Sequence, residues 1–173
     1  DEDLEALVVR ESPSADAAAV TRLAEWVRGR LEAAGVAAER VAFEGRGDGV
    51  FARLGPEAGG TLLLGHLDTV WPFETLAVQP FRAGGNLAFG PGAFDMKGGL
   101  AVILALLSAA AEGAFAPARG VAVLLTSDEE SGSAASRARV LEEARRRERV
   151  FVLEPSGDGG AAKVARKGIG LAA

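Results

Sequence analysis

Cysteine is absent from the 173-residue sequence, and histidine occurs once, at position 66. Disulfide bonds and thiolate metal sites are therefore excluded, so any metal has to be held by histidine, aspartate and glutamate. Long hydrophobic runs are also missing, because the longest apolar stretch, residues 100–111, is too short to cross a bilayer. We therefore expect no membrane partner.

The remaining composition is that of a globular protein with a mild negative charge. Apolar residues make up 49% of the chain and the formal net charge is −5, which argues against nucleic acid as the main partner. None of the glycine clusters has the spacing of a phosphate-binding or dinucleotide-binding loop. No signal peptide is visible, so we expect a cytoplasmic protein, although the chain lacks an initiator methionine and export stays open.

Helical and strand-like segments alternate through most of the chain, which is typical of an α/β domain with a largely parallel central sheet flanked by helices. Ser14 is expected to cap the second helix, which closes at Gly35. Residues 70–94 contain three prolines and are expected to be irregular, and loops of this length are often functional. The predicted helices cover residues 1–9, 15–34, 98–111 and 134–147, and the predicted strands cover residues 40–44, 50–54, 61–64, 121–126 and 150–153.

Polar clusters stand where the apolar segments end. In open α/β sheets the carboxyl ends of the strands form the site, so clusters that follow three strands should converge there. A single imidazole would then meet several carboxylates, whose mutual repulsion a divalent cation relieves. Histidine with carboxylates and no sulfur suits Zn²⁺, with Mn²⁺ or Co²⁺ possible. The residues concerned are His66, Asp68, Asp95, Glu129, Glu130 and Glu154.

Two pairs within these clusters suggest a division of roles. His66 and Asp68 are two apart in an extended segment and share a face, so Asp68 could accept the second ring N–H of His66 and fix the tautomer that binds metal. Glu129 and Glu130 are adjacent and point in different directions. One of them could therefore bind metal while the other acts as a general base.

Ordinary structural roles are open for several of these residues. Glu129 and Glu130 could form an acidic helix start, and Asp95 could cap the following helix while also binding metal. Asp128 is expected at the surface or as a helix cap. Lys97 is expected either beside acidic neighbours or in solvent.

Four segments in order resemble successive motifs of the co-catalytic zinc peptidase family, which includes glutamate carboxypeptidase, succinyl-diaminopimelate desuccinylase, acetylornithine deacetylase and aminoacylase. Each motif alone is weak to moderate, but four in order at natural spacing are highly specific. Residues 166–168 also look like the strand that leads into the lid domain of this family. The four segments are His66–Val70, Gly90–Gly99, Asp128–Ser133 and Leu153–Ser156.

The resemblance implies two zinc ions per full-length protein. His66 and Glu154 would hold one ion, Glu130 would hold the other, and Asp95 would bridge both. The glutamate at position 154 looks like the carboxypeptidase and deacylase branch of the family, since aminopeptidase relatives tend to have aspartate there. The resemblance also implies a cis peptide bond between Asp95 and Met96.

The implied reaction is metal-assisted hydrolysis of an amide bond. Asp68 would orient His66, and Glu129 would take a proton from the attacking water and pass it to the leaving amine. The implied substrate is a small peptide or an N-acyl amino acid with a free carboxylate, and the full-length protein could form a homodimer. The alternatives are a deacetylase or desuccinylase of amino-acid biosynthesis and, outside enzymes, a non-catalytic metal-binding domain.

The sequence departs from the family pattern in lacking a second histidine, which the family supplies to the second metal from the later half of its catalytic domain. The lid domain is absent as well. We therefore interpret residues 1–173 as the N-terminal portion of an incomplete catalytic domain, from a protein roughly twice as long. Alone, this chain is expected to have little or no hydrolase activity.

Overall fold

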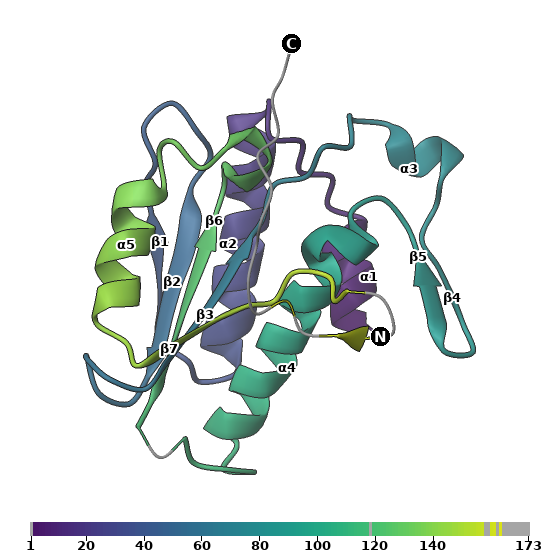
Figure 1. Cartoon of the computed structure of the whole chain (residues 1–173). Coiled ribbons are helices and arrows are strands. Elements are labelled where there is room, and N and C mark those ends of the chain that lie inside the picture. The colour runs from purple at the N-terminus through teal and green to yellow at the C-terminus, as the bar shows by residue number, and fades with distance from the viewer. Residues whose placement is uncertain (1, 118, 158–159, 162, 164–173) are drawn as a thin grey trace.

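The centre of the protein is a five-stranded sheet, in the order β1 (Ala38–Val41), β2 (Gly49–Leu54), β6 (Val121–Thr126), β3 (Thr61–His66) and β7 (Arg149–Val152) (Figure 1). The computed structural model describes residues 2–117, 119–157, 160–161 and 163. Strand β3 pairs in parallel with β6 and with β7, whereas β2 is antiparallel to β1 and to β6. Strand β2 thus runs against the other four, and the predicted α/β class with a largely parallel sheet is confirmed.

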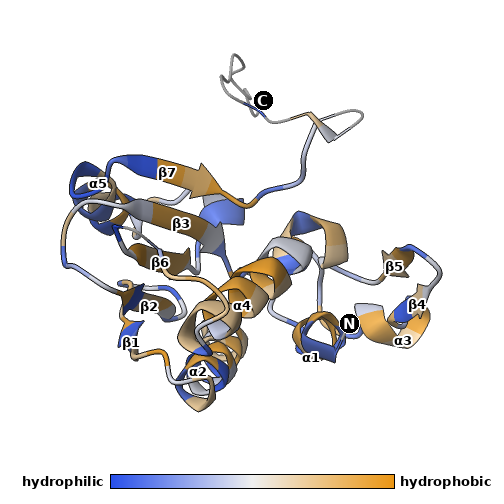
Figure 2. Ribbon diagram, turned by 90° about the horizontal axis from the view of Figure 1, so that it is seen from below, coloured by the Kyte–Doolittle hydropathy of each residue, from blue (hydrophilic) through white to orange (hydrophobic). Residues whose placement is uncertain are grey.

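Helices cover both faces of this sheet. Helices α2 (Ala17–Ala33) and α4 (Gly98–Ala111) lie on one face, and α5 (Arg137–Arg145) lies on the other (Figure 2). Helix α1 (Glu2–Val8) packs against α4 on the side away from the sheet. Strands β3, β6 and β7 run in the same direction, so their carboxyl ends form one edge of the sheet.

The larger core lies between the sheet, α2 and α4. Helix α4 buries a stripe of residues three and four apart, and each such aliphatic side chain contributes about 1.5–3 kcal/mol relative to exposure. Residues 93–111 are long and apolar enough to cross a membrane by length and composition, but this buried stripe makes α4 a core helix of the domain. The buried residues of the stripe are Leu100, Ile103, Leu104 and Leu107.

Two local expectations were wrong, and a third cannot be compared with the described residues. Asp16 caps α2, because its carboxylate accepts the backbone N–H of Ala19 at 2.8 Å, whereas Ser14 does not cap this helix. Residues 70–94 also contain regular structure, in the short helix α3 (Thr75–Val78) and in a hairpin of β4 (Arg82–Gly84) and β5 (Leu87–Phe89). The predicted lid-leading segment, residues 166–168, lies outside the described residues.

Candidate metal centre

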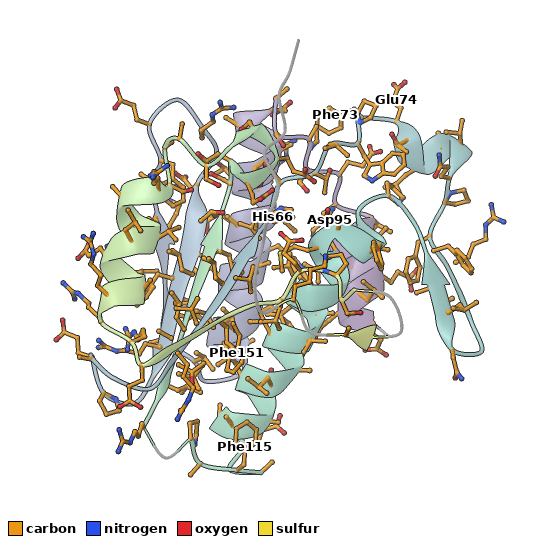
Figure 3. The ribbon with its side chains drawn as sticks, in the orientation of Figure 1. His66, Phe73, Glu74, Asp95, Phe115 and Phe151 are labelled. Atoms are coloured by element: carbon orange, nitrogen blue, oxygen red, sulfur yellow. The ribbon has the colours of Figure 1, made fainter. Side chains whose placement is uncertain are left out.

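The carboxyl ends of β3, β6 and β7 bring one imidazole and four carboxylates together. The Nε2 atom of His66 lies 3.2 Å from Oδ1 of Asp95 and 3.2 Å from Oε1 of Glu154 (Figure 3). Glu129 and Glu130 follow β6 and complete the cluster: the donor atoms of His66, Glu129 and Glu154 lie within 4.8 Å of one another, as do those of His66, Asp95 and Glu130. The predicted convergence of these side chains is therefore confirmed.

Two glycines allow the elements that carry these residues to approach one another. A Cβ atom on Gly65, in β3, would lie 2.7 Å from Cε of Met96, and one on Gly99, in α4, would lie 2.1 Å from the carbonyl oxygen of Leu153. Residues 93–97 form a kinked turn before α4, in which Asp95 and Met96 have non-helical backbone angles, and the Asp95–Met96 peptide is cis, as the family resemblance implied. The turn that carries Asp95 is thus packed directly against β3, and the first residues of α4 are packed against the residue before Glu154.

The ring of His66 is oriented from behind by Asp68. The Nδ1 atom of His66 lies 2.9 Å from the backbone carbonyl oxygen of Asp68 and 3.5 Å from its carboxylate Oδ1. A carbonyl oxygen only accepts, so Nδ1 carries the proton and donates it to the carbonyl. The backbone of Asp68 is therefore the closer acceptor, rather than the carboxylate that the sequence suggested, and Nε2 is left facing the cluster.

The carboxylate of Asp68 receives donors from two other parts of the chain. Its two oxygens accept the backbone N–H groups of Glu129 and Glu130, both at 3.2 Å, and Oδ2 accepts the Ser14 hydroxyl at 2.7 Å. Burial by itself would raise the pKa of Asp68, but hydrogen bonds from His66 and Ser14 hold that pKa below its usual value. Asp68 therefore remains a buried carboxylate that ties β3 to the turn after β6.

The remaining carboxylates repel one another. Burial, and then the charge of other carboxylates in the cluster, raises the pKa of Asp95, of Glu129 and of Glu130 above their usual values. Burial would lower the pKa of His66, yet the carboxylates of Asp68 and Glu154 on either side of its ring raise that pKa to about 11. The carboxylates of the cluster therefore repel one another, and additional positive charge would relieve that repulsion.

A divalent metal ion fits this need. Among the residues that the structure describes, no lysine or arginine forms an ion pair with the carboxylates of Asp95, Glu129, Glu130 or Glu154. One imidazole nitrogen and several carboxylate oxygens form the donor set that zinc and similar ions prefer. The donor atoms are already within a few ångströms of one another, so the residues present fit a metal ion.

Two neighbouring charged residues have structural roles. Lys97 is 2% exposed, and its Nζ donates to the carbonyl oxygen of Arg10 at 2.8 Å, while burial lowers its pKa to about 8. Asp128 is fully buried and accepts the backbone N–H groups of Ala135 and Ser136 just before α5. The expected exposure of Lys97 was therefore wrong. A surface position for Asp128 was wrong as well, and its carboxylate holds the backbone before α5 without making a side-chain cap bond to a helix.

Comparison with known proteins agrees with this geometry. The sequence model of Peptidase family M20/M25/M40 matches residues 62–167. Carboxypeptidase G2 of Pseudomonas sp. (strain RS-16) is 36% identical over 159 residues, which cover 90% of this chain and 38% of that protein. Succinyl-diaminopimelate desuccinylase of Rhodospirillum centenum (strain ATCC 51521 / SW) is 34% identical over 138 residues, which cover 74% of this chain and 34% of that protein.

Solved structures show the same fold. Human carnosine dipeptidase 1 superimposes with a TM-score of 0.76 at 18% identity, over 90% of this chain and 38% of that chain. A metallo-carboxypeptidase from Sulfolobus solfataricus superimposes with a TM-score of 0.73 at 21% identity, over the same shares of the two chains. The chain therefore spans less than two fifths of the length of each of these relatives and structures.

Proposed function

Because the chain belongs to peptidase family M20/M25/M40, whose sequence model covers residues 62–167, we propose that it is the first portion of the catalytic domain of a metal-dependent amidohydrolase. The observation that carries the proposal is the meeting of one imidazole with four carboxylates at one sheet edge. Like charges so close together are unfavourable without a cation. A metal ion explains why this arrangement is built into the fold.

We assign the metal ligands as follows. His66, through Nε2, and Glu154 would hold one ion, Glu130 would hold a second, and Asp95 would be shared by both. Zinc is the proposed metal, with cobalt or manganese as alternatives, because the donors are an imidazole and carboxylates without sulfur. Two ions per complete protein are part of the proposal. This chain supplies only carboxylates to the second of these positions.

The side chains of this chain would contribute to amide hydrolysis in distinct ways. A metal ion bound here would polarise the scissile carbonyl and make water easier to deprotonate. Glu129 is the proposed general base: it takes a proton from the attacking water and delivers it to the amine nitrogen as the C–N bond breaks. Burial and nearby carboxylates raise the pKa of Glu129, which makes its carboxylate a stronger proton acceptor. Asp68 keeps His66 in the ligating tautomer.

The proposed substrate is a small peptide or an N-acyl amino acid with a free carboxylate. Carboxypeptidase G2 and the desuccinylases are relatives with 33–39% identity to this chain, so peptide and N-succinyl substrates are both candidates. A biosynthetic deacylase is thus the second candidate function. A cytoplasmic location and a homodimeric complete protein stay predictions.

The test compares a complete protein that carries this chain with its Glu129→Gln variant. Both are assayed against dipeptides, N-acetyl amino acids and N-succinyl amino acids, with release of the free amine as the readout. We expect hydrolysis that stops on chelation and returns with Zn²⁺. Glu129→Gln should lower kcat by about 10²–10⁴-fold, the usual contribution of a general base.

Metal content distinguishes a lost base from a lost metal site. The Glu129→Gln variant should bind as much zinc as the unsubstituted protein, because Glu129 is proposed as base and not as ligand. Turnover that survives complete metal removal would contradict the proposed function. Loss of zinc in Glu129→Gln would instead move Glu129 into the ligand set.

A further inference from the structure

Ser14 lies beside the metal centre although the motifs that define the centre begin at residue 66. Its hydroxyl is 2.7 Å from Oδ2 of Asp68 and 3.2 Å from the carbonyl oxygen of Thr69. A serine hydroxyl has one proton, and the shorter contact to a charged acceptor is the stronger one. Ser14 therefore donates to Asp68, and Asp16 leaves it free to do so by capping α2.

The segment around Ser14 is fixed to the end of β3 by its backbone. The N–H of Ser14 donates to the carbonyl of Thr69 at 3.1 Å, and the N–H of Thr69 donates to the carbonyl of Ser12 at 2.9 Å. The Ser12 hydroxyl donates to the carbonyl of Leu67 at 2.8 Å. The two backbone bonds to Thr69, the residue after Asp68, hold the Ser14 hydroxyl beside the Asp68 carboxylate, and they do not depend on the Ser12 side chain.

The same segment also reaches the other side of the centre. Lys97, two residues after Asp95, donates its buried ammonium group to the carbonyl oxygen of Arg10 at 2.8 Å. Residues 10–14, which we call the N-terminal strap, thus contact both the strand that delivers His66 and the turn that delivers Asp95.

We propose that Ser14 is a positioning residue of the metal centre, which acts by fixing the carboxylate of Asp68. This inference rests on the proposed function, because it deepens the description of the same site. Asp68 has to present two oxygens at once to the backbone of Glu129 and Glu130 and to the ring of His66. The Ser14 hydroxyl is the closest donor to that carboxylate, so it selects the rotamer in which all these contacts coexist.

The strap supplies a matched control. Ser12 and Ser14 are both serines with a donated hydroxyl, two residues apart, but Ser12 donates to a backbone carbonyl and Ser14 to Asp68. Ser12 is fully buried. Ser12→Ala should therefore lower the melting temperature at least as much as Ser14→Ala while leaving Asp68 in place.

Zinc affinity is the first readout, measured by competition with a chromophoric chelator. Ser14→Ala should bind Zn²⁺ about tenfold more weakly. This is the lower end of the roughly 10- to 100-fold loss of metal affinity that follows when a residue supporting a metal ligand is replaced. Ser14→Thr keeps a hydroxyl and should restore the affinity, whereas Ser12→Ala should remain near the unsubstituted value. Equal loss in Ser12→Ala and Ser14→Ala, or no loss in Ser14→Ala, would overturn the inference.

The second readout needs no metal. His66 is the only histidine in the sequence, so its ring nitrogens give one assignable set of NMR signals. In the metal-free protein, Ser14→Ala should shift these signals at a fixed pH, and Ser12→Ala should not. If the unsubstituted protein binds no zinc but the signals shift as expected, the proposed function fails and the positioning role of Ser14 stands. If zinc binds and neither readout responds to Ser14→Ala, the positioning role alone is wrong.

Discussion

At the back of the metal centre the side chains of His66 and Asp68 are 1% and 0% exposed, whereas at its front those of Asp95 and Glu154 are 51% and 28% exposed. The back is held by hydrogen bonds to the backbone and to Ser14. The front is a set of carboxylates whose charges oppose one another. The fold therefore orients the imidazole in advance, while a cation would relieve the repulsion between the carboxylates at the front.

The largest expected effect comes from removing the ligand that joins back and front. His66→Gln keeps a similar volume but loses the imidazole nitrogen that faces Asp95 and Glu154. Zinc affinity should fall by more than about 100-fold, because replacing a residue that only hydrogen-bonds to a metal ligand already lowers metal affinity about 10- to 100-fold. Chelator competition measures the change, and circular dichroism verifies that the variant is folded. Unchanged affinity in a folded His66→Gln variant would place the metal elsewhere.

The next effect concerns the back alone. Each carboxylate oxygen of Asp68 accepts one backbone N–H, from Glu129 or from Glu130. In Asp68→Asn one of these oxygens becomes an NH₂ group, so in either orientation of the amide two N–H donors face each other. We expect zinc affinity to fall about 10- to 100-fold and the free energy of unfolding to fall by about 2 kcal/mol. Urea denaturation checks the second value, and a variant as stable as the parent would show that the buried back is not held by this carboxylate.

Proton competition should act on the whole centre. The pKa of His66 is raised from 6.5 to about 11 in the fold, so protonation of His66 stabilises the metal-free fold. This stabilisation is fully present at pH values below 6.5, the pKa in the unfolded chain, and it is lost as the pH rises towards 11. Between pH 6 and 8 the zinc ion that His66 binds should therefore displace one proton from His66, and the apparent affinity for that ion should rise about tenfold per pH unit. Isothermal titration calorimetry in buffers of different ionisation enthalpy counts the protons released. A pH-independent affinity would contradict a protonated His66.

The smallest effect is expected beyond the front of the centre. Phe73 lies in the segment between β3 and α3 and is 44% exposed. Phe73→Ala should change the free energy of unfolding by less than about 0.5 kcal/mol and the zinc affinity by no more than about twofold. Thermal denaturation and zinc titration test this. A large loss of affinity would mean that the exposed loop helps to shape the front.

The sequence analysis was most accurate where a continuous apolar pattern defines an element. The predicted helix at 98–111 and strand at 121–126 coincide with α4 and β6. The three-residue strands β4 and β5 are too short to carry such a pattern, so residues 70–94 were expected to be irregular. Convergence of the charged residues could be predicted because parallel strands end at one edge.

Contacts between distant parts of the chain could not be predicted in this way. Ser14 and Asp68 are 54 residues apart, and the local sequence around Ser14 favoured a helix cap over a bond to the metal centre. The burial of Lys97 depends on the carbonyl of Arg10, 87 residues away. Only the assembled structure brings these partners together.

The central claim is that the carboxyl edge of β3, β6 and β7 is a metal centre, and zinc titration of the metal-free protein tests it most directly. Native mass spectrometry counts the ions and calorimetry gives their affinity. We expect about one tightly bound ion per chain, as a single site of three protein ligands provides, and loss of that ion in His66→Gln. A folded protein that shows no saturable zinc binding would contradict the account, and two tight ions with full turnover would contradict the interpretation of the chain as an incomplete catalytic domain.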